Sequence, residues 1–199
     1  RLSPARAALK YRGNNMITEE IHFTLNDGRK ALLRNPKEEE AEELLNYFRT
    51  AVSETDFLLM SPQDCENYTV ESERAFIRGM NCSDSVIMLT CFVGKEVAGN
   101  CQLTFKTNLK ERHRATIDLA ILRKFWNLGI GSAIFENLIA LALRNEDVLQ
   151  LELDFLEGNV RARALYEKFG FRITGVKPDA IRLNDGKLYN IYSMVKKLR

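Results

Sequence analysis

The chain has 199 residues, of which 45% are hydrophobic and 28% are charged, and its 29 basic residues nearly balance its 27 acidic residues. These values are typical of one globular domain, and a net charge of +2 gives no reason to expect a nucleic-acid partner. The longest apolar stretch, around residues 135–143, is far shorter than the roughly 20 residues that a membrane span requires, so we expect no membrane contact.

The cysteines and histidines lack the spacing of a metal site. No Cys-x-x-Cys pair occurs, and neither His22 nor His113 has a Cys or His nearby, so no bound metal is expected. Four scattered cysteines are typical of a reducing compartment, which predicts a cytoplasmic protein. Residues 1–15 are basic and aperiodic, and Met16 follows them. We interpret them as an N-terminal extension or an artificial remnant, and residues 16–199 as a single domain.

The first elements in chain order are a β-hairpin and a helix. Residues 21–25 and 30–34 are predicted strands around Asn-Asp-Gly, which is a strong hairpin signal. Asn35 is the expected cap of the helix that follows. This helix begins with Pro36 and three glutamates, and its apolar residues recur at helical spacing up to Val52.

A second helix with acidic residues at its start is predicted over residues 71–80. Its Glu71 and Glu73 would suit a cationic ligand, but acids are also ordinary at the start of a helix. Two further helices are predicted to begin at Gly129 and at Val160, and they alternate with strands. These strands are expected over residues 85–93, 97–107, 114–122, 149–156, 171–177 and 188–195.

The order of these elements predicts the fold. It indicates an α/β architecture with a mixed, mostly antiparallel sheet of about seven strands and helices on both faces. The strand–helix–strand segment around Gly131 requires one parallel pair of strands that is joined by a crossover. No internal repeat or low-complexity tract is visible.

The turn that follows the strand ending at Ile121 carries two glycines, Gly129 and Gly131, and leads directly into a helix. Glycine permits backbone conformations closed to other residues and lets a ligand approach the main chain. Exposed N–H groups at the positive end of a helix favour a phosphate or a diphosphate. The turn matches neither the dinucleotide-binding fingerprint nor a Walker loop, and alone it also fits an ordinary tight connection.

A second segment makes the pattern specific. Residues 126–132 read Trp-Asn-Leu-Gly-Ile-Gly-Ser, and residues 159–171 read Asn-Val-Arg-Ala-Arg-Ala-Leu-Tyr-Glu-Lys-Phe-Gly-Phe. In order and spacing, the two segments resemble the acetyl-CoA loop, Arg/Gln-x-x-Gly-x-Gly/Ala, and the second motif of the GNAT superfamily of N-acetyltransferases. The resemblance covers about residues 86–195. The chain departs from the pattern at Trp126, where Arg or Gln is usual, and at Asn127, where glycine is common.

The resemblance implies a reaction and its participants. The acetyl donor would be acetyl-CoA, the acceptor an amine of a small molecule or a protein, and no metal would be needed. The pantetheine arm would pair with the backbone of the strand that ends at Ile121, Asn159 would bind the pantetheine or the phosphate end, and Tyr166 would lie near the sulfur. The diphosphate would accept hydrogen bonds from the backbone N–H groups of Leu128, Gly129, Ile130, Gly131 and Ser132.

Acetyl transfer requires a neutral amine within about 3–3.5 Å of the thioester carbonyl and a proton for the leaving thiolate. Tyr166 is the predicted proton donor, because a phenol with a pKa of about 10 is matched to a thiol; the alternative is a tyrosine that only packs its helix. Asp118 is the candidate base, and it fits equally a structural carboxylate paired with Arg or Lys. His113 is a weaker candidate. Glu152 and Asp154 are more typical of solvated or paired side chains.

Other interpretations stay open at this point. One is a CoA-binding sensor or scaffold without turnover, and another is a nucleotide-binding protein that uses the same loop for a different phosphate. Arg161 and Arg163 either contact the CoA phosphates or solubilise their helix. A homodimer is also compatible with the sequence, and no feature selects among acceptor amines.

Overall fold

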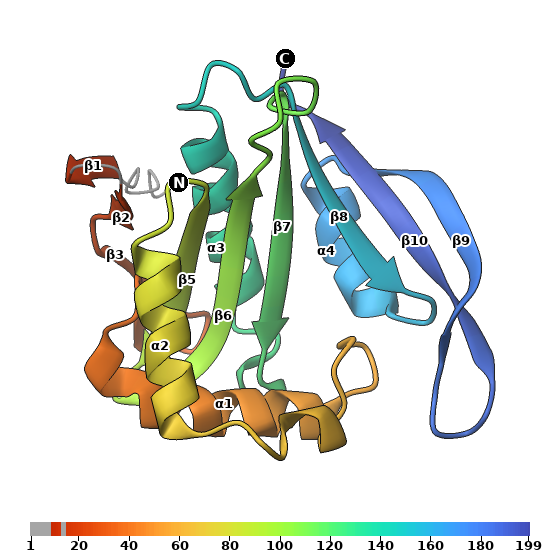
Figure 1. The fold of residues 1–199 in the computed structure, drawn as a ribbon, viewed down its shortest axis with the longest axis horizontal. Helices are drawn as coiled ribbons and strands as arrows, with labels where there is room; N and C mark the ends of the chain where they lie inside the picture. The colour runs from red at the N-terminus through yellow and green to blue at the C-terminus, as the bar shows by residue number, and fades with distance from the viewer. Residues whose placement is uncertain (1–8, 13–14) are drawn as a thin grey trace.

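The computed structural model describes residues 9–12 and 15–199, and Figure 1 shows their arrangement. One eight-stranded sheet consists of β3 (Ile21–Thr24), β4 (Lys30–Arg34), β5 (Val86–Val93), β6 (Glu96–Phe105), β7 (Arg114–Ile121), β8 (Gln150–Leu156), β9 (Arg172–Arg182) and β10 (Leu188–Lys197). The strand order is β3-β4-β5-β6-β7-β8-β10-β9. Only β7 and β8 are parallel neighbours in this sheet. The predicted mixed sheet is confirmed, with eight strands instead of about seven.

Helices cover both faces of the sheet, as predicted (Figure 1). The helices α1 (Ala41–Glu54) and α2 (Val70–Asn81) lie in front of the sheet in this view, and α3 (Ile130–Ala142) and α4 (Val160–Lys168) lie behind it. The connection from β7 to the parallel strand β8 runs through α3. Residues that follow the carboxyl end of β7 and residues that follow β8 therefore approach each other at one end of the sheet.

The start of α1 differs from the prediction. A 3-10 turn, Glu38–Glu40, precedes the helix, and Lys37 is the N-cap of that turn. Asn35 was the expected cap, and this prediction is wrong. The Asn35 side chain instead accepts a hydrogen bond from the N–H of Thr18 at 2.8 Å and donates one to the carbonyl of Met88 at 3.0 Å. It connects segments that are distant in sequence, and local helix-start signals do not reveal such a contact.

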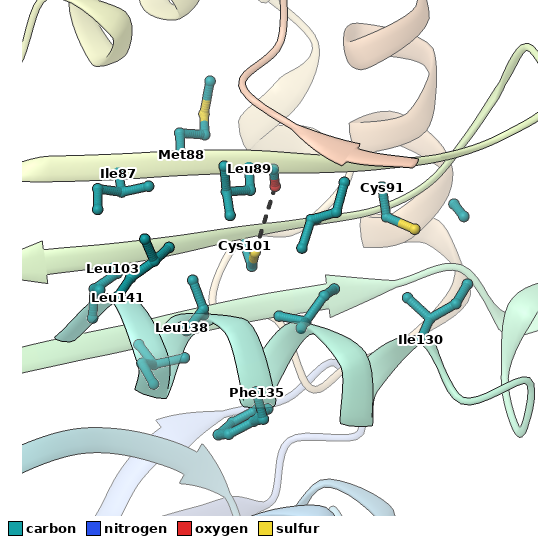
Figure 2. Close-up of a cluster of buried hydrophobic side chains, with 14 of the residues drawn as sticks. Ile87, Met88, Leu89, Cys91, Cys101, Leu103, Ile130, Phe135, Leu138 and Leu141 are labelled. Carbon is teal, nitrogen blue, oxygen red and sulfur yellow. Dashed lines mark hydrogen bonds between the residues drawn. The ribbon is translucent and has the colours of Figure 1, made fainter. Parts of the chain in front are cut away.

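The core lies between α3 and the central strands. In Figure 2, Phe135, Leu138 and Leu141 of α3 lie below β5 and β6, and Met88 points to the opposite face of the sheet. Every residue of β5 after Val86 is buried, because helices cover both faces of this strand. Each fully buried Leu, Ile or Phe contributes about 1.5–3 kcal/mol to stability. This packing fixes the position of α3, and so it also fixes the turn that precedes α3.

A separate ribbon precedes the main sheet. β1 (Leu9–Arg12) pairs antiparallel with β2 (Asn15–Thr18). Of the predicted extension, residues 1–15, part therefore forms strand, while residues 1–8 and 13–14 lie outside the described residues. The assignment of residues 16–199 to one domain stays a prediction. Across the described ranges, none of the helices combines the length and the apolar character needed to cross a bilayer.

Candidate active site

The turn between β7 and α3 leaves backbone donors open. After Ile121 the chain passes through Asn127 and Gly129, whose φ angles are 62° and 91°. Gly129 is the N-cap of α3 and has no side chain that could cap the helix. In the described part of the chain, no hydrogen-bond acceptor is found for the N–H groups of Leu128, Gly129, Ile130, Gly131 and Ser132. An anion that accepts hydrogen bonds from these N–H groups is also stabilised by the positive end of the α3 dipole.

The hairpin turn between β3 and β4 holds this loop from outside. The N–H of Asn26 donates to the carbonyl of Leu128 at 3.0 Å, and its Nδ2 donates to the carbonyl of Asn127 at 3.0 Å. In a trans peptide the C=O and the following N–H point in opposite directions. The N–H groups of Leu128 and Gly129 therefore point away from Asn26.

The two glycines of the loop serve different purposes. Gly129 adopts a left-handed conformation, and a Cβ there would also lie 3.2 Å from Oδ1 of Asn26. Gly131 has no positive φ, but a Cβ at this position would lie 2.9 Å from Cδ2 of Leu165 on α4. Gly129 is thus required by the shape of the turn, and Gly131 by the close approach of α3 and α4.

β7 and β8 separate beside this loop. Their pairing ends at Thr116 and Glu152, although β7 continues to Ile121 and β8 to Leu156. Figure 1 shows the two strands diverging, with α4 behind them. Past Thr116, the edge of β7 that faces the opening has no strand partner among the described residues. An extended chain can therefore pair with this edge as an added strand.

Trp126 already occupies part of this edge. Its Nε1 donates to the carbonyl of Ile121 at 2.7 Å, so this oxygen, which belongs to the predicted pantetheine contact, is bonded by the protein itself. The N–H of Leu122 donates to the carbonyl of Ala98 on β6, so the backbone groups of Leu122 point toward β6. Backbone groups alternate in direction along a strand, so those of the odd-numbered residues of β7 point toward the opening. Ile117 and Leu119 present their N–H and C=O to the opening, so further backbone positions are available there.

Asn159 is the N-cap of α4. Its Oδ1 accepts a hydrogen bond from the N–H of Ala162 at 3.1 Å, and this cap explains why a helix begins here. The Nδ2 of Asn159 has no acceptor in the described part of the chain. One half of the amide therefore stabilises α4, and the other half is free to donate to a ligand.

Tyr166 lies on α4 with its ring in an aromatic cluster. The ring is 9% exposed, and its centroid lies 5.4 Å from that of Phe135 and 6.0 Å from that of Phe155. The Tyr166 hydroxyl has no hydrogen-bond partner among the described residues. Burial, with a contribution from the charge of Asp118, raises the pKa of Tyr166 to about 12. The ring therefore packs α4 against α3 and β8, and the charge of Asp118 acts on the hydroxyl.

Asp118 lies on β7 beside the opening. Because Ile121 of the same strand contacts Gly131 of α3, alternation places Asp118 on the opposite face of the sheet. Asp118 is exposed and makes no ion pair within the described ranges. In the parallel pairing of β7 and β8, Thr116 lies beside Glu152. If this register is continued by two residues, Asp118 of β7 and Asp154 of β8 face each other across the opening. Partial desolvation raises the pKa of Asp118, and the charge of Asp154 adds to this effect. In the described part of the chain, neither Arg nor Lys pairs with Asp118, whereas the structural alternative requires such a pair.

The other sequence candidates lie in different surroundings. Glu152 accepts two hydrogen bonds of 2.6 Å from Arg114, which lower the pKa of its carboxyl group, so it is a paired structural acid. His113 precedes β7 at the end where the strands are paired, away from the opening. Glu71 pairs with Arg74, whereas Glu73 is 9% exposed and burial raises its pKa.

Two features near the site have no signal in the sequence. Asp154 becomes the neighbour of Asp118 only through the register of β7 against β8. The hydroxyl of Tyr47 on α1 enters the β6–β7 ladder, where it accepts from the N–H of Asn100 at 3.0 Å and donates to the carbonyl of Ala120 at 2.8 Å. Tyr47 is buried, and its pKa is raised by this burial. Both contacts depend on tertiary packing, which the spacing of residues along one strand does not show.

Solved structures of acetyltransferases share this fold. An acetyltransferase of the GNAT family from Streptococcus pneumoniae is 28% identical, with a TM-score of 0.77 over 84% of this chain and 99% of that chain. The putative acetyltransferase yncA from Salmonella typhimurium, solved with its cofactor acetyl-CoA, is 14% identical, with a TM-score of 0.71 over 85% and 94% of the two chains. RimL, a ribosomal L7/L12 alpha-N-protein acetyltransferase in complex with coenzyme A, is 19% identical, with a TM-score of 0.71 over 84% and 93%.

A family model gives the assignment. The model of the acetyltransferase (GNAT) family matches residues 49–171, which is more than half of the chain. The matched segment begins within α1, includes the open turn before α3 and the opening between β7 and β8, and ends just after α4. The resemblance found in the two sequence motifs is confirmed. The chain belongs to the GNAT family of acetyltransferases.

Proposed function

We propose that this protein transfers an acetyl group from acetyl-CoA to a primary amine of a small molecule or a protein. The observation that carries the proposal is the row of five open N–H groups at the start of α3, beside the opening between β7 and β8. A diphosphate on these donors directs the pantetheine arm into the opening, where its amides pair with the free edge of β7. Nδ2 of Asn159 supplies one more donor to the arm.

The proposed chemistry needs two proton transfers. As the new carbon–nitrogen bond forms and the carbon–sulfur bond breaks, one proton leaves the amine and one reaches the sulfur. Asp118 takes the proton of the amine, since its raised pKa makes it a stronger base than an ordinary aspartate. Tyr166 donates to the sulfur. The phenolate of Tyr166 then takes up a proton, and Asp118 releases the one that it took from the amine, so both groups end in their starting protonation states.

The pKa of Tyr166 defines the nature of its contribution. A value of about 12 keeps the phenol protonated at neutral pH, but it makes the phenol a weaker acid than the free side chain. The match to a thiol that the sequence predicted is therefore poorer than expected. Tyr166 acts mainly as a hydrogen-bond donor that stabilises the charge developing on the sulfur.

The charge at the opening supports an amine acceptor. Among the described residues, Asp118 has no cationic partner within hydrogen-bond reach, and the ion pair of Asp154 is a contact of 3.9 Å with Lys177. Carboxylates that are not tightly paired attract a cationic amine, which releases one proton to solvent and then attacks as the neutral amine. The acceptor amine therefore approaches from the front face of the sheet, opposite α4.

Thiol release from acetyl-CoA across a panel of amines tests this proposal. The panel contains polyamines, aminoglycosides, amino acids, lysine peptides and peptides with free N-termini. We expect turnover with at least one class, and we expect Tyr166→Phe to lower kcat by about 100-fold while the KM for acetyl-CoA changes little. Tyr189→Phe, which removes a surface hydroxyl bonded to Asp185, is the control and keeps full activity. Coenzyme A binding without turnover of any amine would instead favour a sensor.

A further inference from the structure

Two arginines near the start of α4 have different surroundings. Nε of Arg163 donates to Oε1 of Glu167 at 2.8 Å, one helical turn further along. Arg161 has no carboxylate partner anywhere in the described ranges. A guanidinium that is held in one place without an acid remains available to another anion.

The Arg161 guanidinium is held against the loop that precedes α3. Its central carbon lies 4.4 Å from the centroid of the Trp126 ring, and its Nη1 donates to Oδ1 of Asn127 at 3.0 Å. These contacts use one face of the group and one of its five N–H donors. Burial lowers the pKa of Arg161, but a guanidinium stays charged at neutral pH. The remaining donors lie next to the loop whose N–H groups are open.

The edge of the Trp126 ring is held as well. Its Nε1 donates to the carbonyl of Ile121 at 2.7 Å, which anchors the indole to the end of β7. The indole therefore forms a platform between the end of β7 and the start of α4. A cation stacked on a fixed aromatic ring loses little further freedom when it binds an anion.

A second cation of α4 contacts the other end of the same loop. Nζ of Lys168 donates to Oγ of Ser132 at 2.8 Å, and like Arg161 it has no ion-pair partner in the described part of the chain. Arg161 thus contacts Asn127, the residue before the five open N–H groups, and Lys168 contacts Ser132, the last residue of the five. Both cations belong to the helix that packs closely against Gly131.

We propose that Arg161 binds a phosphate group of the acetyl donor, and that Trp126 and Asn127 hold its guanidinium in position for this contact. The inference rests on the proposed binding of acetyl-CoA at the loop. The donor offers phosphate in two places, the diphosphate and the ribose 3′-phosphate, and both present oxygen pairs that match a planar guanidinium. Arg161 is then a binding residue, and Trp126 is a positioning residue.

The chain has one tryptophan, Trp126, so its fluorescence reports on this position directly. Coenzyme A is titrated into the full chain of wild type and of each variant, and the dissociation constants are obtained from the change in Trp126 fluorescence. Calorimetry measures the same dissociation constants without relying on the indole. Arg161→Gln is expected to raise the Kd by about 10–100-fold, since a charge-assisted contact is lost. Arg163→Gln is the matched control, and its Kd is expected to stay within about twofold of wild type.

Titration with 3′-dephospho-coenzyme A identifies which phosphate is bound. If Arg161 contacts the 3′-phosphate, wild type and Arg161→Gln bind this ligand equally; if it contacts the diphosphate, the difference between them persists. Either result supports the inference. An unchanged coenzyme A affinity in Arg161→Gln, or an equal loss in Arg163→Gln, overturns it. Wild-type protein that binds no coenzyme A overturns the proposed function as well.

The positioning role of Trp126 has its own test. Trp126→Ala is expected to raise the KM for acetyl-CoA about 10-fold with little change in kcat, and Trp126→Phe, which keeps an aromatic face, is expected to restore most of the loss. In the double variant Trp126→Ala/Arg161→Gln, the second change adds little to the first. Fully additive losses, or no rescue by Phe, would show that Trp126 does not act through Arg161.

Discussion

The helices α2 and α3 begin in opposite ways. At α2, the Thr69 hydroxyl accepts the N–H of Ser72, the Ser72 hydroxyl accepts the N–H of Thr69, and the helix start is closed by its own side chains. At α3, Gly129 offers no side chain, and the N–H groups that follow have no partner among the described residues. Closed donors stabilise the fold, whereas open donors are available to a ligand.

The two edges of β7 repeat this difference. Toward β6, the Tyr47 hydroxyl fills a gap in the ladder, so the backbone groups of Asn100 and Ala120 are both bonded. Toward β8, pairing stops at Thr116 and the edge is left free. The same strand is thus closed on the side that holds the sheet together and open on the side where the acetyl donor is proposed to lie.

Placing a carboxylate in the open helix start should have the largest effect. Gly129→Asp puts a negative charge beside the free N–H groups and forces a side chain into a conformation with a φ of 91°. We expect the KM for acetyl-CoA to rise by about 100-fold or more, because the charge repels the diphosphate. Gly94→Asp is the control, since Gly94 also has a positive φ but a Cβ there has nothing within 4 Å. An unchanged KM in Gly129→Asp would contradict the open-donor interpretation.

The second-largest effect should be a loss of stability when the Tyr47 hydroxyl, which closes the β6–β7 ladder, is removed. Tyr47→Phe leaves one partly buried N–H and one partly buried carbonyl without partners, and each costs about 1–3 kcal/mol. We expect the free energy of unfolding to fall by about 2–4 kcal/mol in chemical denaturation. The surface variant Tyr189→Phe should differ from wild type by less than about 0.5 kcal/mol. A loss in Tyr47→Phe no larger than this would show that the ladder closes without the hydroxyl.

Opening the closed helix start should have a smaller effect, confined to stability. Thr69→Ala removes the cap of α2 and should lower the free energy of unfolding by about 1 kcal/mol. The KM for acetyl-CoA should not change, because α2 lies on the opposite face of the sheet from α3. Thr69→Ser retains the hydroxyl and should restore stability. A changed KM would mean that α2 also contributes to donor binding.

The pH dependence of stability should show the smallest effect. Because the folded-state pKa of Asp118 is raised, its carboxylate destabilises the fold once the pH exceeds the unfolded value of about 3.8. Asp118→Asn should therefore have a higher Tm than wild type at pH 7, and the difference should vanish as the pH falls toward 3.8. Asp185, whose pKa is lowered by its hydrogen bonds with Lys187 and Tyr189, should show the opposite sign. Equal Tm profiles for Asp118→Asn and wild type would contradict the raised pKa.

The open helix start could be predicted from the sequence because its signals are local. Gly129 and Gly131 stand directly before an apolar helical repeat, and alternation along residues 114–121 reads as a strand. The open edge of β7 is harder to predict from the sequence. It depends on where the pairing with β8 stops, and that point is set by packing between distant segments. For the same reason the sequence does not reveal that Asp154 is a neighbour of Asp118.

The contacts of Trp126 and Asn35 show most clearly what cannot be predicted from the sequence. Trp126 was identified only as a departure from the family pattern, while the structure uses its indole N–H to bond Ile121 and its face to hold Arg161. Asn35 fits a helix cap by its position in the sequence, but its amide bonds Thr18 and Met88 instead. A residue type narrows the chemistry of a side chain, and the three-dimensional neighbours decide which partner it takes.

Asn26 has a consequence for where this enzyme can be divided. It holds the carbonyl groups of Asn127 and Leu128 from a hairpin that precedes the family match, which starts only at residue 49. A shortened chain that keeps the matched segment alone would retain every motif residue and lose the brace behind them. Chimeras with other members of the family should therefore exchange the β3–β4 hairpin together with the loop.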